Sequence, residues 1–596
     1  MPDRAPVAAS DAILPWWQHA GWYRAVTLAE RLMARRSASA SLPTPTPPNR
    51  EPAQHRLQDW KAQPPSQHRP AFATRLAAEG VTEQELLDLL AEPPEALQAR
   101  LTPPEWLDAL RQAFDGAAPA IDLPEGVADE RDPVAGFVPA LHPLLAWGRH
   151  RLLLGIDALE QQYPHVPIDV PALVPSLLDA LSRRLLAQVS RVFALELQVA
   201  SRQWRLAGAT LQARFDAFVQ RLCHREALLA LLEEYAVLAH QHVQTIDHWV
   251  AANLEMMDHL CADWQKIRAT FAPEDDPGLL LEVGSKAGDR HRGGRSVLLL
   301  RFSSGWRLVY KPKSLAIDCH FQGLLCWLNA CGAEPPLQPL RVLECGTYGW
   351  SAFVAEAACG SEEEVQRFYE RQGAYLALLY VLEGTDLHCE NVIAAGEYPM
   401  LVDLETLFQP RIPMEEVLGA TEPAFEALQR SVGRVGLLPH RMWGNEEASG
   451  VNISGLGGED GQLSPRSVPQ WEGAGTDQLR LVHARQQIPV SQNRPRLHGQ
   501  AIDAAPYRDR ILPGIILFLA YLAALTKQQR YQNLAEAAFQ NTRTLLTHPR
   551  KQEVIKSISA FNGWGGLMYL SPTWGASGRK QRSFRKLRNS RDCSLI

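Results

Sequence analysis

Residues 383–408, EGTDLHCENVIAAGEYPMLVDLETLF, constrain the fold more than any other part of the chain. Two short apolar runs, 392–393 and 400–402, flank a glycine at position 396 and predict a β-hairpin. The polar sequence TDLHCEN directly precedes the first run, and Asp403 directly follows the second. The fold must therefore accommodate a polar loop followed by a hairpin that carries an acid at its end.

Three oxygen-bearing side chains in this stretch have a spacing that phosphoryl transfer uses. Asp386 precedes Asn391 by five positions, and Asp403 follows twelve positions later. In protein kinases a loop Asp positions the hydroxyl nucleophile, an Asn five residues on binds one magnesium ion, and a later Asp binds the other. The pattern predicts these three roles here. The alternative is that Asp386 and Asn391 only cap a turn, but one loop rarely gathers so many oxygen ligands beside apolar strands.

A lysine upstream extends this pattern. The β-rich runs 297–302 and 306–311 are separated by Ser-Ser-Gly and predict a hairpin that ends on Lys311. A kinase keeps the lysine that contacts the α- and β-phosphates at such a strand end. Alone, Lys311 would be interpreted as a solvated lysine, and no acidic partner for it is apparent. The glycine-rich loop 288–294 precedes the hairpin and could offer amides and arginines to phosphate oxygens.

Length and composition set outer limits on the kind of protein. The chain has 596 residues, 46% of them apolar, which predicts several domains with a large core. The formal charge of −6 argues against a general nucleic-acid binder. The nine cysteines form no CxxC pair, which favours reduced thiols over a zinc finger or a redox pair. No signal pattern is present and the longest apolar run, 511–525, is too short to span a bilayer, so a cytoplasmic protein is expected.

The predicted fold class is α+β, with a kinase-like catalytic core, a large helical N-terminal module and a truncated helical C-terminal segment. In chain order we expect a helical region, a module of amphipathic helices, the catalytic core, a short helical segment and a basic tail. The predicted boundaries of these five regions are 1–139, 140–277, 278–510, 511–570 and 571–596. The long helices expected within the module are 171–197, 203–235 and 245–271.

Four motifs, in this order, resemble the dehydratase domain of class II lanthipeptide synthetases, the LanM enzymes: GDRHRGG, VYKPKSL, GTDLHCEN and VDLETLF. The resemblance runs from about residue 140 to residue 507. It implies a lipid-kinase-like fold that phosphorylates Ser and Thr of a precursor peptide with ATP and Mg²⁺, then eliminates phosphate to leave dehydroalanine or dehydrobutyrine. It also implies a precursor peptide with its leader, and a membrane exporter complex, as partners.

The resemblance implies a role for each matching residue of the nucleotide site. Lys311 would contact the ATP phosphates, and Asp386 would orient the substrate hydroxyl with His388 beside it. Asn391 and Asp403 would bind magnesium.

Three further residues match the family near the metals and the phosphate. Glu405 would be an additional acid near the metals, and Asp289 and His291 would serve in elimination. Phosphate leaves far more readily than hydroxide, so phosphorylation makes β-elimination feasible, given a base for the Cα proton and cations for the departing phosphate.

The chain departs from the family after Tyr507. The family continues through an Arg and a Thr that phosphate elimination needs, whereas here PYRD runs into LPGIILFLAYLAALTKQQRYQNLAEAAF, which resembles the start of the cyclase domain. We therefore expect an internal deletion near Arg510 and impaired elimination. Asn541-Thr542-Arg543 offers an Arg and a Thr, but in a cyclase-like helix, so the role is not transferred to them.

The last residues are also atypical. From Ser571 the sequence is basic and loses apolar periodicity, as in a disordered tail or a shifted reading frame. A basic leader-peptide-binding tail is the rival interpretation. No His/Cys cluster follows Trp564, so neither zinc nor cyclisation is expected.

Two other functions stay open. The loop and the acid that follows it also resemble small-molecule phosphotransferases of the aminoglycoside and choline kinase type, although the flanking motifs favour the peptide enzyme. An inactive remnant that still binds peptide or ATP is the alternative outside catalysis.

Overall fold

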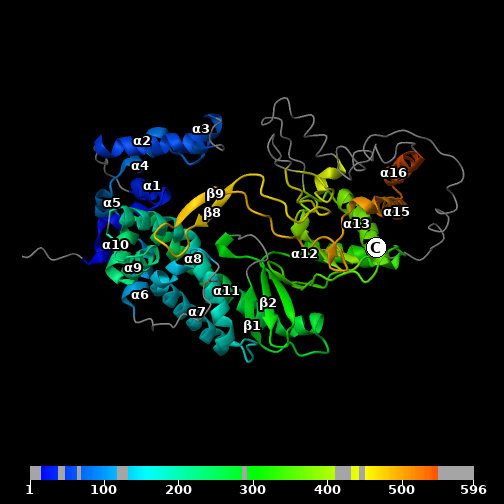
Figure 1. The fold of residues 1–596 in the computed structure, drawn as a ribbon, viewed down its shortest axis with the longest axis horizontal. Coiled ribbons are helices and arrows are strands. Elements are labelled where there is room, and N and C mark those ends of the chain that lie inside the picture. The colour runs from blue at the N-terminus through cyan, green and yellow to red at the C-terminus, as the bar shows by residue number, and fades with distance from the viewer. Residues whose placement is uncertain are drawn as a thin grey trace, which may run out of the picture.

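The computed structural model describes most of the chain as helices around two large hydrophobic cores, with two small ones in the N-terminal region. The described residues are 15–37, 47–63, 69–116, 132–203, 205–284, 292–409, 431–441 and 450–547. The predicted Asp289 and His291 lie outside these residues, and so does the predicted tail 571–596. N-terminal helices lie at one end of the molecule and the lobe of α13, α15 and α16 at the other, with a β-sheet between them (Figure 1).

The N-terminal region consists of short helices. Their bounds are η1 Trp16–Gln18, η2 Ala20–Ala25, α1 Leu28–Ser37, α2 Pro47–Ala62, α3 Arg69–Ala78, α4 Glu83–Ala91, α5 Pro94–Arg100 and α6 Glu105–Asp115. Thr82 caps α4 through a capping box with Glu85, so two of the unpaired backbone N–H groups at this helix start are satisfied.

The next module is dominated by two long helices, α8 and α11. Its elements are η4 Ala135–Leu141, α7 His142–Gln162, α8 Val170–Arg202, α9 Leu211–Cys223, α10 Arg225–Glu234 and α11 Ala236–Phe271. The prediction of one helix over 203–235 was wrong, because α9 starts only at Leu211, after its N-cap Thr210, and His224 adopts an extended backbone conformation that separates α9 from α10. The apolar faces of α7, α8 and α11 form the first core.

A five-stranded antiparallel sheet packs on this module, with the strand order β1-β2-β3-β5-β4. The strands are β1 Leu280–Gly284, β2 Leu298–Phe302, β3 Arg307–Lys311, β4 Val342–Glu344 and β5 Gly349–Ala352. The hairpin predicted to end on Lys311 is formed by β2 and β3, which pair from Leu298↔Tyr310 to Arg301↔Arg307. Leu308 and Tyr310 belong to the first core. Because side chains alternate along a strand, Lys311 projects from the opposite face.

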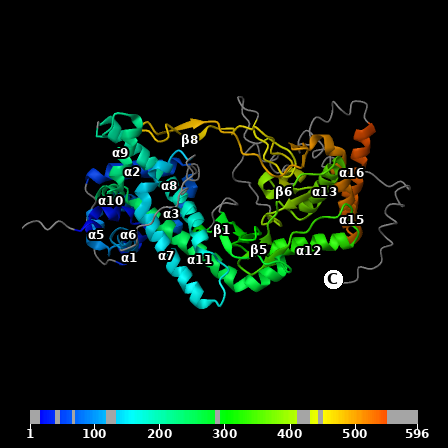
Figure 2. The ribbon, with the colours of Figure 1, turned by 60° about the horizontal axis from the view of Figure 1, so that its bottom comes forward.

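Most of the remaining elements form a second lobe around α13, whereas η5 Arg292–Gly294 packs on α11, and β8 Val468–Glu472 and β9 Arg480–Ala484 form a separate two-stranded sheet. The elements of the lobe are α12 Ala316–Ala330, α13 Glu362–Val381, η6 Cys389–Asn391, β6 Val392–Ala395, β7 Tyr398–Leu401, η8 Val432–Val435, β10 Arg496–Leu497, β11 Gln500–Ala501, η9 Ala505–Tyr507, α15 Arg508–Thr526 and α16 Gln529–Thr547. The hairpin predicted around Gly396 is formed by β6 and β7, and Gly396 has a positive φ of 61° in its turn. Figure 2 shows this hairpin beside α13.

Helix α15 packs closely on α13. A Cβ atom at Gly373 would lie 1.9 Å from the carbonyl oxygen of Ile511, and one at Gly514 would lie 2.1 Å from that of Glu370. The two backbones approach this closely because both helices carry glycine where they meet. Residues 508–526 therefore share one core with the lobe that carries the polar loop. The assignment of 511–570 to a cyclase-like segment stays a prediction.

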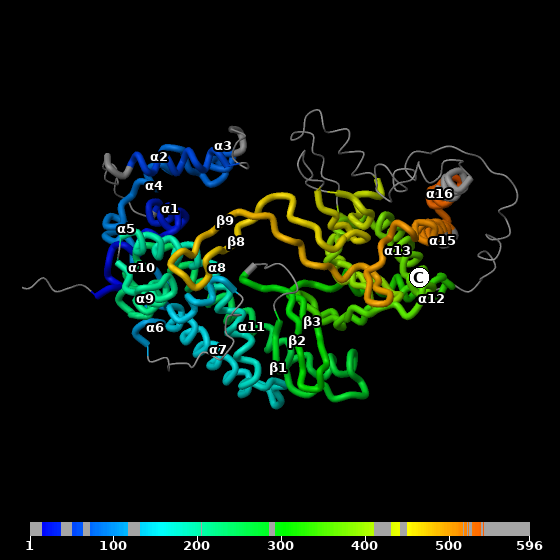
Figure 3. Tube along the Cα trace, in the orientation of Figure 1, coloured from blue at the N-terminus to red at the C-terminus, as the bar shows by residue number. Residues whose placement is uncertain are grey.

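A two-stranded ribbon, β8 and β9, extends from this lobe to the N-terminal module (Figure 3). Its turn is anchored there by Asp477, whose side chain is 3% exposed and accepts hydrogen bonds from Arg214 Nε at 2.6 Å and Ser201 Oγ at 2.7 Å. Leu479 is buried in the first core. The ribbon thus links the lobe around α13 to the module that contains α8 and α9.

Candidate functional site

Lys311 lies against the end of the β6–β7 hairpin. Its Nζ donates a hydrogen bond to the carbonyl oxygen of Val402 at 2.5 Å, and its side chain is only 6% exposed. Val402 directly precedes Asp403. The structure therefore brings the predicted phosphate lysine and the predicted metal acid together, although 91 residues separate Lys311 from Val402.

An acidic partner for Lys311, which the sequence did not reveal, lies on α12. Asp318 Oδ1 is 3.6 Å from Lys311 Nζ, and the Asp318 side chain is also 6% exposed. Burial raises the pKa of the Asp318 carboxyl, and the charge of Lys311 opposes that rise. The only sequence signal for this partner was an acid in the first turn of the helix that follows β3.

A second lysine, also not predicted, contacts both acids of the VDLET motif. Lys313 Nζ donates to Asp403 Oδ1 at 2.8 Å and to Glu405 Oε2 at 2.5 Å. Burial alone would raise the pKa of the Asp403 carboxyl, but the hydrogen bond and charge of Lys313 outweigh it and hold that pKa below its ordinary value. Burial likewise opposes the charge of Lys313, yet the two carboxylates raise its pKa. Asp403 and Lys313 are therefore both ionised at neutral pH.

The polar loop presents Asp386 to solvent. Its side chain is 64% exposed, and its backbone has a φ of 61°, an uncommon conformation for a residue other than glycine. Asn391 Nδ2 donates to the Asp386 carbonyl oxygen at 2.8 Å, which closes the loop. His388 Nε2 lies 3.9 Å from Asp386 Oδ1 and 3.4 Å from Asn391 Nδ2. The loop and the hairpin are joined by a hydrogen bond from Val402 N to Asn391 O at 3.1 Å.

The back of the loop is held by two distant segments. Leu387 N donates to Val435 O at 3.0 Å, and Cys389 N donates to Ile453 O at 2.8 Å. A Cβ atom at Gly455 would lie 2.6 Å from the Leu387 carbonyl oxygen, so only glycine fits there. This contact is supported in turn by Asn493, a buried residue of the predicted Asn-Arg-Pro turn, whose Nδ2 donates to the Gly455 carbonyl oxygen at 2.8 Å.

The predicted magnesium ligands fit an ion that arrives with its own phosphate ligands. In the described part of the chain, no three His, Cys, Asp or Glu side chains gather closely enough to hold a metal ion by themselves. Magnesium is commonly bound by one or two carboxylates together with substrate phosphates, so a closed protein cage is not required. Asp403 offers a carboxylate, Asn391 an amide oxygen and Glu405 a second carboxylate, which satisfies that donor chemistry.

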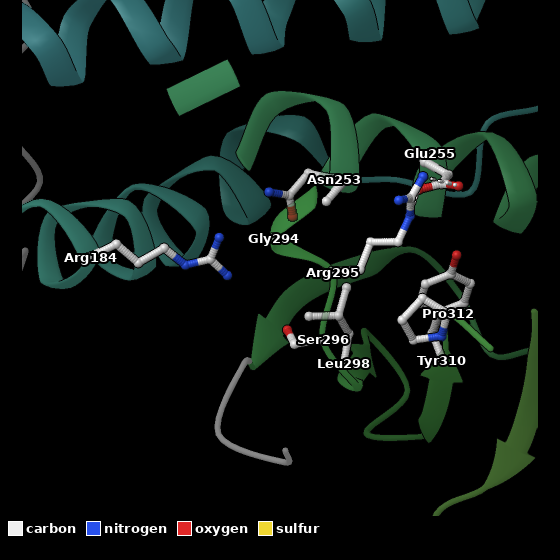
Figure 4. Close-up of a pocket in the computed structure, with 10 residues that line it drawn as sticks. Arg184, Asn253, Glu255, Gly294, Arg295, Ser296, Leu298, Tyr310 and Pro312 are labelled. Carbon is white, nitrogen blue, oxygen red and sulfur yellow. Dashed lines mark hydrogen bonds and ion pairs between the residues drawn. The ribbon is translucent and has the colours of Figure 1, made fainter. Parts of the chain in front are cut away.

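A separate polar slot lies where α8 and α11 meet the start of β2. Arg184 and Ser296 project toward it from α8 and from the segment before β2 (Figure 4). Its volume is about 10 Å³, the space that one water molecule needs. The Ser296 hydroxyl is buried and has no hydrogen-bond partner among the described residues. Tyr310 also lines the slot, which places the slot on the face of β3 opposite Lys311 and apart from the cluster around Asp403.

Comparison with known proteins places the chain in a family. The model of the family described as "Domain of unknown function (DUF4135)" matches residues 235–551, more than half of the chain. The chain belongs to this family. The DUF4135 match includes every predicted site residue and continues past Tyr507 through α15 and α16.

A curated relative extends this comparison. The lacticin 481/lactococcin biosynthesis protein LcnDR2 of Lactococcus lactis subsp. lactis is 31% identical over 178 residues. The aligned segment is 28% of this chain and 19% of the relative, so the chain matches less than a fifth of that protein's length. The resemblance to class II lanthipeptide synthetases that the four motifs predicted is thereby confirmed. Among the described helices, none combines the length and the apolar character needed to cross a bilayer.

Proposed function

We propose that this DUF4135 chain acts in lanthipeptide biosynthesis as a peptide dehydratase whose first step phosphorylates Ser or Thr of a precursor peptide with ATP. The relative's printed name, a biosynthesis protein for lacticin 481 and lactococcin, supports the pathway. The observation that carries the chemistry is the hydrogen bond from Lys311 to Val402. This hydrogen bond places the Lys311 ammonium beside Asp403, and the hydrogen bond from Val402 N to Asn391 O joins the same site to the loop of Asp386. Phosphoryl transfer requires such an arrangement of a cation, a metal-binding acid and a catalytic loop.

The proposed fold of this region is a kinase-like core. Support comes from an antiparallel sheet whose third strand ends on Lys311, a following helix that supplies Asp318, and a polar loop that leads into the β6–β7 hairpin. In protein kinases the phosphate lysine pairs with an acid on a neighbouring helix, and the metal acid follows the catalytic loop. The order of these parts along the chain is the same here.

Each side chain has a proposed part in the transfer. Asp386, exposed at the tip of its loop, would accept the proton of the incoming Ser or Thr hydroxyl, and His388 beside it would orient that hydroxyl. Lys311, held rigidly by Asp318, would contact phosphate oxygens of the nucleotide. Asn391 and Asp403, with Glu405 as a further acid, would hold magnesium, which supplies charge neutralisation at the transferring phosphoryl group when bound.

The second step of the proposed reaction is the elimination of phosphate. Asp289 and His291, the pair that the resemblance assigns to this step, lie outside the described residues. The family's Arg and Thr have no assigned counterparts in this sequence. We therefore propose that phosphopeptide accumulates and that thioether cyclisation, which would need zinc ligands, does not follow. Exporter association and a cytoplasmic location also remain proposals.

Mass spectrometry of a Ser- and Thr-containing precursor peptide tests this function. With ATP and Mg²⁺ the peptide should gain about 80 Da for each phosphate added. Asp386→Asn is the matched inactive control, since it keeps the size of the side chain and removes the base. Clean loss of water would show that elimination is intact. Faster turnover of ATP with small alcohols than with any peptide would favour the small-molecule phosphotransferase, and nucleotide binding without any transfer would favour the inactive remnant.

A further inference from the structure

Lys313 differs from Lys311 in its acidic partners and in its exposure to solvent. Its ammonium group bridges Asp403 and Glu405, the two carboxylates proposed for the metal site, at 2.8 and 2.5 Å. Its side chain is 23% exposed, compared with 6% for Lys311. Lys311 is therefore buried, whereas Lys313 is partly exposed to solvent and bridges the two carboxylates proposed to bind the metal.

The two lysines also differ in how freely they can leave their partners. Lys311 donates a hydrogen bond to the Val402 carbonyl and forms an ion pair with Asp318, so moving Lys311 would leave the buried Asp318 carboxylate without a partner. Lys313 is less constrained, because Glu405 is 51% exposed and water can replace the ammonium there. A lysine also has a flexible four-carbon stem and a compact charge that reorients easily.

A magnesium ion and the Lys313 ammonium compete for the same oxygens. Magnesium binds carboxylate oxygens at about 2.1 Å, so an ion on Asp403 Oδ1 would lie within about 5 Å of an ammonium that stayed in place, 2.8 Å from the same oxygen. Two like charges at that distance repel strongly in a partly buried site. Metal and ammonium therefore cannot both keep these contacts.

We propose that Lys313 is an exchangeable counter-ion of the metal site. In the absence of metal it neutralises Asp403 and Glu405 and keeps the two carboxylates side by side. When magnesium takes these oxygens, the Lys313 ammonium, still protonated, moves to the terminal phosphate of the nucleotide. Lys313 is then a second phosphate-binding residue, besides Lys311. This inference rests on the proposed function, because it deepens the description of the same site.

Metal titration in the absence of nucleotide tests the exchange directly. The probe is Mn²⁺, followed by electron paramagnetic resonance, with wild type, Lys313→Gln and Lys313→Arg. Removing the competing charge should tighten Mn²⁺ binding to Lys313→Gln about tenfold, whereas Lys313→Arg should bind like wild type. The matched control is Lys266→Gln, which removes an exposed lysine 3.2 Å from Asp263, far along the chain from the site, and should change nothing.

The second readout is the nucleotide. Phosphorylation by Lys313→Gln should show an apparent KM for ATP raised about tenfold, and Lys313→Arg should largely restore it. Equal or weaker Mn²⁺ affinity in Lys313→Gln than in wild type, including no detectable binding in either, would overturn the exchange. A purely structural salt bridge would give that result together with a lower melting temperature. If wild type transfers no phosphate to any peptide, the proposed function fails, while the Mn²⁺ comparison still decides the role of Lys313.

Discussion

Lys311 and Asp318 form a buried ion pair, with 3.6 Å between Nζ and Oδ1 and each side chain 6% exposed. The pair connects the end of β3 to the first turn of α12. Charges this deeply buried are costly unless they are paired and hydrogen-bonded. Asp318 therefore fixes Lys311 against the Val402 carbonyl, next to Asp403, the proposed metal ligand.

Removing the lysine from this pair should destabilise the fold as well as stop the chemistry. Lys311→Met leaves the Asp318 carboxylate buried without its partner, which should cost about 3 kcal/mol of unfolding free energy. Adding Asp318→Asn should recover part of that loss, because the stranded charge is removed. Urea denaturation of the two single variants and the double variant measures the coupling. Purely additive single effects would show that the two side chains do not interact.

Removing the loop acid should affect catalysis alone. Asp386 is exposed and makes no buried ion pair, so Asp386→Asn should leave the melting temperature nearly unchanged. The rate of peptide phosphorylation should fall about 10²- to 10⁴-fold, the usual contribution of a general base. Nucleotide-induced thermal stabilisation should persist. A variant as fast as wild type would exclude Asp386 as the base.

Acid should weaken the N-terminal module through His242. This residue of α11 is fully buried, which lowers the pKa of its imidazole to about 4, and its Nδ1 is 2.8 Å from Gln188 Oε1. An unfolded histidine titrates near pH 6.5, so between about pH 6.5 and 4 the unfolded chain binds a proton that the folded chain does not. The contribution of His242 to stability is therefore complete above pH 6.5 and is lost as the pH falls toward 4, by up to about 3 kcal/mol.

Denaturation at several pH values checks this, with His242→Asn as the comparison. The variant keeps a donor toward Gln188 but cannot take up the proton. Its stability should fall less steeply than that of wild type below pH 6.5. Parallel pH profiles for the two proteins would contradict a role for His242.

The contact between α13 and α15 can be tested with one methyl group. Gly373→Ala would place a Cβ atom 1.9 Å from the Ile511 carbonyl oxygen, so the helices must separate, at a cost of about 2–3 kcal/mol. Gly323→Ala is the matched control, since Gly323 lies within α12 with nothing within 4 Å of the added atom, and alanine favours a helix by up to about 1 kcal/mol. Thermal melting of the two variants should therefore shift in opposite directions. A neutral Gly373→Ala would mean that α15 does not pack here.

The local elements of the site could be predicted because short-range patterns determine them. The hairpin around Gly396 and the hairpin that ends on Lys311 follow from short apolar, β-rich runs separated by turn residues. The single helix predicted over 203–235 failed at two places. Gly208 has a positive φ and Thr210 caps a new helix at Leu211, whereas apolar residues continue at helical spacing across the second break at His224. Asp289 and His291 lie outside the described residues, so their roles in elimination stay predictions.

By itself, the sequence determined which residues carry charge, which segments become strands or helices, and the spacing of Asp386, Asn391 and Asp403 along one loop and hairpin. Only the tertiary structure decided the pairings, because they join elements that the chain separates by many residues. Lys313 meets Glu405 across 92 positions, and Leu387 meets Val435, which lies beyond the β6–β7 hairpin in the chain. Such contacts depend on how two hydrophobic cores pack, and packing responds to the shape of the whole chain rather than to any local motif.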